Sequence, residues 1–412
     1  MSYGFKPSVS NLSREERLMR QAWRWYGPDD PVTLDHVRQA GATEIVSALH
    51  QYAPGEVWPQ KAVAERKAII ENTPPGRSPL KWTVIESIPV PDDIQRGSDG
   101  AAKQTEIWIE SMRAVAAEGI RTICYNVMPV VDWTRTDLDY PMPTGATALR
   151  FDYDRFAAFD LHVLKRKSAE ASYDEGTRAR AKKVADGLSQ SEAELLTKNI
   201  AAGLPGATTF SANLDAFRER IASYGAITPD KMRANVAAFL AKVTPVAEQL
   251  GVRLTLHPDD PPRPIFGLPR IASTRADYEA LFKAVPSRAN GICFCVGSLG
   301  ARPDNDVVQM ARDFAPRTYF AHLRATTIDD KGKSISFTES DHLDGDVNMV
   351  DVLRAMVAEN RTRDEAWRIP FRPDHGHRML DDIEKTRINP GYTGIGRLKG
   401  LGELRGVIRA LQ

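Results

Sequence analysis

Short apolar runs recur along the chain, and longer amphipathic stretches separate them. The runs are rich in Val, Ile and aromatic residues, a composition typical of parallel strands that are buried on both faces. We predict eight strands, at residues 22–27, 44–50, 82–90, 121–130, 252–258, 291–297, 318–324 and 368–376. Intervening stretches such as VAERKAIIEN and VVQMARDFA have helical periodicity. Eight alternating strand–helix units predict an α/β fold closed into a (β/α)8 barrel rather than an open sheet.

One interval interrupts this rhythm, between about residues 131 and 235. The segments DYDRFAAFDLHVLKRK and FRERIASYG, with a charged run between them, have a helical pattern punctuated by Gly and Pro. We predict a helical insertion after the fourth strand, within a single domain that spans residues 1–412. The insertion is interpreted as a lid or dimer contact, and a solvated helical excursion is the alternative. The polar residues 1–21 predict a loosely held N-terminal arm.

Composition and charge narrow the classes of partner. Apolar residues make up 42% of the chain and charged residues 26%, which suits a globular protein with a large core. The 55 basic and 54 acidic residues nearly cancel, so no global charge favours nucleic acid or an anionic membrane. We find no apolar run of about 18 residues and no signal-peptide core. These features predict a cytoplasmic protein with a small-molecule partner, no nucleic-acid partner and no membrane partner.

Four of the predicted strands end on a side chain that can bind a metal. These residues are His257 in LTLHPDD, Cys295 in CFCVGS, His322 in YFAHLR and Asp374 in FRPDHGH. Each one alone has a structural alternative, as a core or loop histidine, an inert buried thiol or a helix cap. Because the carboxyl ends of barrel strands converge on one mouth, their joint occurrence predicts a single divalent metal site. The mixed N, S and O donors favour zinc or ferrous iron over magnesium or calcium.

The three cysteines form no disulfide framework and are predicted to stay reduced. Cys293 and Cys295 are two residues apart in one predicted strand, so they face the same side of it. Cys293 is then expected one layer deeper in the barrel. Cys295, nearer the strand end, is the better metal ligand.

Further polar residues are predicted at the same mouth as candidates for substrate binding. They are Arg24, Tyr26, His50, Glu86 and Asn126 at the ends of the first four strands, and Arg324 just after His322. Arg24 and Arg324 suit bidentate binding of a carboxylate. Mutual pairing of charges on the barrel rim is the structural alternative for each.

Two residues are the candidates for proton transfer. His375 directly follows the predicted ligand Asp374, and Tyr392 lies in NPGYTGIGRLKG just downstream. Histidine transfers protons near neutral pH, whereas tyrosine needs a lowered pKa to act as a base. His377 is a weaker candidate, and Asp259 and Asp260 are predicted to brace His257 or its loop. The sequence does not decide which of His375 and Tyr392 is the base.

Several long motifs resemble the mannonate dehydratase family. They include WRWYGPDDPV, IRTICYNVMPVVDWTRTDL, HPDDPPRPIFGLPRI, FCVGSLGARPDND and FRPDHGHRML, and the resemblance runs from about Trp23 to the carboxyl end. It implies a TIM barrel of the xylose isomerase-like kind, a need for Fe2+ or Mn2+, and dehydration of D-mannonate to 2-keto-3-deoxy-D-gluconate in hexuronate catabolism. By motif, it also implies His257, Cys295, His322 and Asp374 as metal ligands, with His375 and Tyr392 as catalytic residues.

The main alternative function is another metal-dependent sugar or sugar-acid isomerase or epimerase on the same barrel. Such sites are richer in carboxylates and lack a thiolate, so Cys295 argues against this alternative. A metal-dependent nuclease or phosphodiesterase would need more metal ions and a basic groove. A binding protein that has lost catalysis would be expected to lack His375, Tyr392 or the thiolate. We also predict a homo-oligomer, with a dimer favoured.

Overall fold

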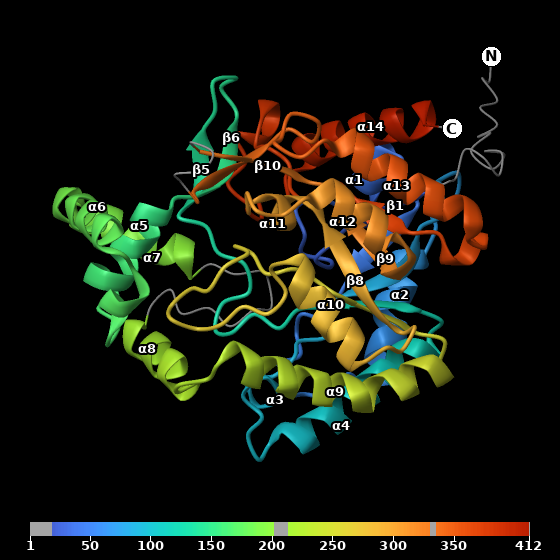
Figure 1. Cartoon of the computed structure of the whole chain (residues 1–412). Helices are drawn as coiled ribbons and strands as arrows, with labels where there is room; N and C mark the ends of the chain where they lie inside the picture. Colours follow the sequence, from blue (N-terminus) through green and yellow to red (C-terminus); the bar gives the residue numbers. More distant parts are fainter. Residues whose placement is uncertain (1–18, 202–212, 330–334, 412) are drawn as a thin grey trace.

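Eight parallel strands close into a barrel in which β1 pairs with both β2 and β12 (Figure 1). The computed structural model describes residues 19–201, 213–329 and 335–411. The barrel strands are β1 (Arg20–Arg24), β2 (Glu44–Ser47), β3 (Lys81–Glu86), β4 (Thr122–Tyr125), β7 (Arg253–Leu256), β8 (Asn290–Cys295), β9 (Thr318–His322) and β12 (Pro370–Arg372). All eight predicted strands, and with them the closed barrel, are confirmed.

The predicted N-terminal arm falls mostly outside the described residues, which begin at Met19. Its last residues are not an arm, because Arg20 and Gln21 already pair with Pro370 and Phe371 of β12 and help to close the barrel. Met19 is buried as well. The prediction that the arm extends to residue 21 is therefore wrong at its end.

Side chains fill the inside of the barrel in layers. One layer consists of buried, mostly small or β-branched residues, Ala22, Val46, Val84, Cys124, Cys293 and Phe320. β-Branched residues pack well on pleated strands, and strands covered on both faces need few polar positions. Cys293 thus lies deeper than Cys295, which ends β8. The polar residues at the strand ends rest on this apolar layer.

A helix follows each barrel strand and covers its outer face. The eight covering helices are α1 (Leu34–Ala40), α2 (Gln60–Glu71), α4 (Ala101–Ala117), α9 (Pro229–Gln249), α10 (Arg275–Ala284), α12 (Val307–Phe314), α13 (Met349–Thr362) and α14 (Gly394–Ala410). Two shorter helices, α3 (Asp92–Arg96) and α11 (Val296–Gly300), lie in the strand–helix loops. Among the described residues, no helix is long and apolar enough to cross a membrane.

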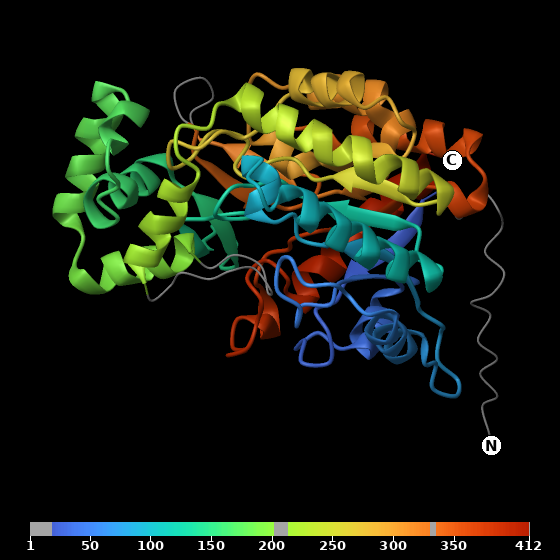
Figure 2. The same ribbon diagram turned by 90° about the horizontal axis from the view of Figure 1, so that it is seen from below.

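An insertion after the fourth strand is present and is mostly helical. It contains α5 (Tyr153–Ala158), α6 (Glu175–Gly187), α7 (Gln190–Ile200) and α8 (Leu214–Ser223), together with a π-helical segment (Phe159–Val163). These helices lie together at one end of the molecule in both views (Figures 1 and 2). The predicted boundary near residue 235 is too late, because α9 begins at Pro229, capped by Thr228, and packs on α3, α4 and β7 as a barrel helix.

The insertion begins with a β-hairpin that the helical prediction missed. Strands β5 (Asp137–Pro141) and β6 (Thr147–Phe151) form this hairpin, and β6 pairs with β11 (Phe337–Ser340). Strand β10 (Ala325–Ile328) completes a four-stranded antiparallel sheet in the order β10-β11-β6-β5. Because β10 begins three residues after β9 ends, the sheet stands directly at the mouth of the barrel.

Candidate metal centre and proton-transfer site

A small cavity of about 40 Å3 lies at the carboxyl ends of the barrel strands. Its wall includes eight of the predicted site residues, His257, Asp374, His375, Tyr392, Arg24, Glu86, Asn126 and Arg324. Predicted residues from the first strand to the last therefore meet at one mouth, as expected for catalytic groups of a (β/α)8 barrel.

The four predicted metal ligands lie close together. His257 Nε2 is 3.1 Å from His322 Nδ1, and the Cys295 sulfur lies within 4.8 Å of one ring nitrogen of each histidine. The Asp374 carboxylate is 3.8 Å from His322 Nδ1 and 3.9 Å from the Cys295 sulfur. Asp374 takes a left-handed backbone conformation, φ 64°, which aspartate tolerates better than most residues. The four donors can therefore share one ion.

Hydrogen bonds from outside the cluster hold the two imidazole rings in place. His257 Nδ1 lies 2.6 Å from the carbonyl oxygen of Pro258, so Nδ1 carries the hydrogen and Nε2 presents its lone pair to the cluster. His322 Nε2 accepts a hydrogen bond from Arg372 Nε at 3.1 Å, and it also lies 3.5 Å from the Glu86 carboxylate. The Pro258 carbonyl behind the His257 ring is the usual kind of support for a metal-binding histidine.

Charge keeps the anionic donors ionised although they are buried. Burial raises the pKa of the Cys295 thiol, but the Arg324 charge and hydrogen bonds with His257 and His322 outweigh it and hold the pKa well below its usual value. Burial likewise opposes ionisation of Asp374, and Arg372 leads the charges that hold its pKa well below its usual range. Metal ligands must be deprotonated, so two neutral imidazoles, a thiolate and a carboxylate fit Fe2+, Mn2+ or Zn2+.

The backbone brings Tyr392 beside His375. The Gly376 amide donates to the carbonyl oxygen of Gly391 at 2.8 Å, and Gly376 forms an isolated parallel bridge with Tyr392. The His375 and Tyr392 rings then meet edge to face, 4.9 Å between centroids. Gly391 has φ 78°, and a Cβ there would come within 2.8 Å of the His375 ring. Only glycine combines this conformation with the close approach.

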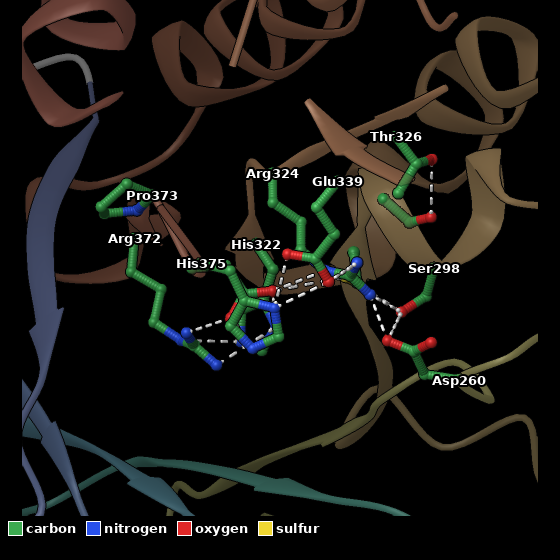
Figure 3. Close-up of polar contacts among 12 residues, drawn as sticks. Asp260, Ser298, His322, Arg324, Thr326, Glu339, Arg372, Pro373 and His375 are labelled. Atoms are coloured by element: carbon green, nitrogen blue, oxygen red, sulfur yellow. Dashed lines mark hydrogen bonds and ion pairs between the residues drawn. The ribbon is translucent and has the colours of Figure 1, made fainter. Parts of the chain in front are cut away.

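Glu339 of β11 holds His375 from the second sheet. Its carboxylate oxygens lie 2.8 and 2.9 Å from His375 Nδ1 (Figure 3). The carboxylate is also paired with Arg135 at 2.6 Å and with Arg324 at 2.8 Å. A hydrogen on Nδ1 leaves Nε2 of His375 free to exchange a proton, and Nε2 lies 3.8 Å from Asp374 Oδ1. Glu339 therefore fixes which ring nitrogen serves the site.

Protonation of Glu339 at acidic pH should lower the stability of the folded protein. Burial raises the pKa of this carboxyl, but His375, Arg324 and Arg135 lower it to about 2, against 4.5 ordinarily. As the pH falls, Glu339 is therefore protonated in the unfolded chain before it is protonated in the folded protein. Its contribution to stability is lost as the pH falls from about 4.5 to about 2. We expect the free energy of unfolding, measured with urea from pH 6 downward, to fall more steeply for the wild type than for Glu339→Gln. Parallel profiles of the two proteins would contradict this assignment.

Tyr392 is held in its protonated form. Burial raises its pKa to about 12, although the nearby Arg372 charge works in the opposite direction. The Arg372 guanidinium lies 5.6 Å from the centre of the Tyr392 ring. At neutral pH the phenol is therefore a proton donor and not a ready base.

The predicted substrate-binding residues differ in which cavity they line. Arg24 and Asn126 line both the small cavity and an adjoining cavity of about 490 Å3, which Ser87 and Asp132 also line. His50 lines only the larger cavity. Among the described residues that line the two cavities, Tyr26 is absent. Its ring packs edge-on against that of Tyr392, with 4.9 Å between the centroids. Glu86 lines the small cavity but is bound to Arg372 at 2.7 Å and Arg24 at 3.0 Å.

Arg324 is better explained as an internal brace than as a carboxylate binder. It reaches the cavity, but two of its guanidinium nitrogens face Asp260 and Glu339 (Figure 3), and the third faces Asp374. Ser298 accepts a further hydrogen bond from it at 2.9 Å. These pairs fit the alternative of mutual charge pairing on the barrel rim better than bidentate binding of a substrate carboxylate, because each guanidinium nitrogen already lies within 4.0 Å of a carboxylate.

The loop after His257 is braced as predicted, and Asp259 and Asp260 bind different partners. Asp259 accepts hydrogen bonds from the Ala272 amide at 2.7 Å and the Ser273 hydroxyl at 2.8 Å, so it holds the loop. Asp260 instead binds Arg135 through both oxygens, at 2.7 and 3.0 Å, and also Arg324. His377 donates to the Glu339 carbonyl at 2.9 Å and, among the described residues, is not part of the cavity wall.

Sequence reasoning missed Arg135, Arg372 and Glu339. Arg372 had a signal, because it lies two residues before Asp374 and alternation places both on the inner face of the last strand. Glu339 had a weaker signal, the alternating stretch ISFTES, which is read as a short strand only when its partner is known. Arg135 lies in the loop before the unpredicted hairpin.

Comparisons with known proteins give a consistent result over nearly the whole chain. The profile of a family described as D-mannonate dehydratase (UxuA) matches residues 19–412. The chain is 57% identical over 393 residues to the mannonate dehydratase of Brucella canis, covering 95% of this chain and 97% of the relative. It is 52% identical over 396 residues to that of Chromohalobacter salexigens, covering 96% and 99%. The crystal structure of mannonate dehydratase from Streptococcus suis superposes with a TM-score of 0.74 at 32% identity, covering 95% and 93%.

Proposed function

The chain belongs to the D-mannonate dehydratase family, and we propose that it is a hydro-lyase that converts D-mannonate to 2-keto-3-deoxy-D-gluconate and water with Fe2+ or Mn2+. The donor cluster of His257, Cys295, His322 and Asp374 supports the metal requirement most directly. Its imidazole nitrogens are 3.1 Å apart, and His257 is hydrogen-bonded in the tautomer that a metal needs. An ion of more than four coordination positions keeps room for substrate beside these four ligands.

Removal of water from a sugar acid begins with loss of the weakly acidic hydrogen next to the carboxylate. When bound, the metal ion supplies Lewis acidity that stabilises the negative charge developing on that carboxylate. In this proposal His375 accepts the C2 proton at Nε2, and the Glu339 carboxylate stabilises the imidazolium that results. His375 is suited to this step because its free nitrogen faces the metal ligand Asp374.

The C3 hydroxyl is a poor leaving group until it receives a proton. Tyr392 holds its proton, since its pKa is raised by burial to about 12, and its ring lies against that of His375. We therefore assign Tyr392 as the acid that protonates the departing hydroxyl. The enol that remains tautomerises to the 2-keto acid.

The larger cavity supports a direction for the substrate. It adjoins the small cavity through Arg24, Ser87, Asn126 and Asp132. With the carboxylate end in the small cavity beside the metal ligands, the polyol end of a six-carbon acid extends into the 490 Å3 cavity. Asn126 and His50 then face its hydroxyl groups. Burial and the Arg24 charge lower the pKa of His50 to about 3, so it serves there as a neutral hydrogen-bonding group.

The proposal is tested by supplying the metal-free protein with Mn2+ or Fe2+ and a panel of hexonates. D-Mannonate should yield a 2-keto acid whose mass is lower than that of the substrate by one water. The alternative, an isomerase or epimerase, would leave the mass of the substrate unchanged. Absence of keto acid from D-mannonate with both ions would refute the proposed reaction.

Glu339→Gln should lower kcat by about 100-fold, because the neutral amide no longer stabilises a charged His375 and no longer fixes its tautomer. The binding of Mn2+ should change much less, since Glu339 is not part of the donor cluster. Steady-state kinetics and a Mn2+ titration of the same preparation check both points. Asp382→Asn is a matched control that removes another buried carboxylate, one that is not among the residues of the cavity wall. Equal losses of kcat in the two variants would mean that Glu339 acts only through the fold.

The proposal also includes the cellular location, the partners and the oligomeric state of the enzyme. The balanced charge of the chain supports a cytoplasmic enzyme without nucleic-acid or membrane partners. A homo-oligomer, with a dimer favoured, belongs to the same proposal. Sedimentation of the purified protein at micromolar concentration gives its mass directly.

A further inference from the structure

A second group of soft donor atoms lies below the catalytic cluster. The sulfurs of Cys124 and Cys293 and one ring nitrogen of His322 all lie within 4.8 Å of one another, and all three residues are buried. Cys124 comes from β4 and Cys293 from β8, in the inner layer of the barrel. Small apolar packing explains the burial of two cysteines, but it does not explain why both meet an imidazole.

This group is accessible from the catalytic cavity. Cys124 is part of the cavity wall, whereas Cys293 is fully enclosed behind it. The two sulfurs lie within 4.8 Å of each other, so an ion that enters the barrel mouth meets Cys124 first and finds Cys293 directly behind it.

The chemistry of the group selects a class of ion. Two thiolates neutralise a divalent cation and, with one imidazole, form a soft donor set. Harder ions such as Mn2+ gain less from sulfur and prefer a site that contains a carboxylate. We propose that Cys124, Cys293 and His322 form an inhibitory binding site for a soft divalent cation, represented by Zn2+ and Cd2+.

Binding at this second site excludes binding of the catalytic metal, because both sites need His322. A neutral imidazole has a single lone pair, since its other nitrogen carries a hydrogen. An ion held by Cys124 and Cys293 through either nitrogen of His322 therefore removes that ligand from His257, Cys295 and Asp374. The inhibition rests on the proposed metal-dependent dehydration, but the binding of the soft ion does not.

The first test measures inhibition by Cd2+ of the Mn2+-loaded enzyme and of Cys293→Ala. Cys293 belongs neither to the catalytic cluster nor, among the described residues, to the cavity wall, so the variant should keep its Mn2+-supported turnover. The Cd2+ concentration for half inhibition should rise by at least about 10-fold, as expected when one of three ligands is lost. An unchanged value would overturn the proposal, because the catalytic cluster itself would then be the Cd2+ target.

The second test reads binding without activity. Metal-free Cys295→Ala keeps Cys124, Cys293 and His322, so Cd2+ should still produce ultraviolet thiolate-to-metal absorption of two sulfur ligands. The double variant Cys293→Ala/Cys295→Ala should lose at least half of that absorption. Absence of the signal in Cys295→Ala would overturn the second site, even where D-mannonate turnover by the wild type supports the proposed function. The signal in Cys295→Ala, together with a wild type that does not convert D-mannonate, would support the second site and count against the proposed reaction.

Discussion

Cys295→Ala is expected to lower kcat/KM for D-mannonate by at least about 100-fold and to weaken Mn2+ binding strongly. The substitution removes a metal ligand, and loss of a residue that only supports a ligand already lowers metal affinity or activity by about 10- to 100-fold. The thiolate is the only sulfur in the catalytic donor group, and it lies under the positive charge of Arg324. Alanine leaves three ligands for the ion. The loss should therefore appear both in metal affinity and in turnover at saturating Mn2+.

The same strand offers a matched control. Cys293 lies two residues earlier in β8, on the same inward face, and is equally buried. Cys293→Ala makes the same chemical change one layer deeper, outside the catalytic donor group. Mn2+ titrations and steady-state kinetics of both variants separate loss of a ligand from loss of packing. Equal effects in the two variants, or full Mn2+ affinity in Cys295→Ala, would contradict the assignment of Cys295 as a ligand.

The convergence of the candidate metal ligands could be predicted from the sequence because the barrel itself brings strand ends together. His257, Cys295 and His322 each stand at the end of an apolar run that needs no distant partner to be recognised as a strand. Once eight such runs imply a closed barrel, residues at equivalent ends must converge. Local patterns and one topological rule were enough for this part of the site.

The support of His375 could not be predicted in the same way. Glu339 comes from β11, which pairs with the neighbouring β10 and, on its other side, with β6 almost 190 residues earlier, as in Thr338 with Arg150. The hairpin partner of β6 is β5, which has no buried residue and carries little apolar signal, so the surrounding helical pattern dominated the prediction. Long-range pairing between two short strands leaves no local trace in either of them.

The role of Arg324 also depended on long-range contacts. Two residues after His322, it was correctly expected at the barrel mouth. Its three carboxylate partners come from the loop after β7, from β11 and from the end of β12. Position along a strand gives the location of such an arginine, but only the fold shows whether its charge is already compensated.

His375→Asn and Tyr392→Phe are expected to fail at different steps of the reaction. Each should lower kcat by about 100- to 10,000-fold, the usual contribution of a positioned acid or base, with Mn2+ binding retained. His375→Asn lacks the group that accepts the C2 proton, so D-mannonate incubated in D2O should gain no deuterium at C2. Tyr392→Phe keeps His375 and Glu339 but lacks the proton for the C3 hydroxyl, so it should exchange the C2 hydrogen without losing water.

Recovered substrate analysed by mass spectrometry and proton NMR separates these outcomes. Wild-type enzyme stopped at partial conversion provides the reference for exchange, and Mn2+ titration shows that both variants still hold the ion. Because burial keeps the pKa of Tyr392 at about 12, its phenol should remain a donor across the neutral pH range. Deuterium at C2 with His375→Asn, and none with Tyr392→Phe, would reverse the two roles and make the tyrosine the base despite its raised pKa.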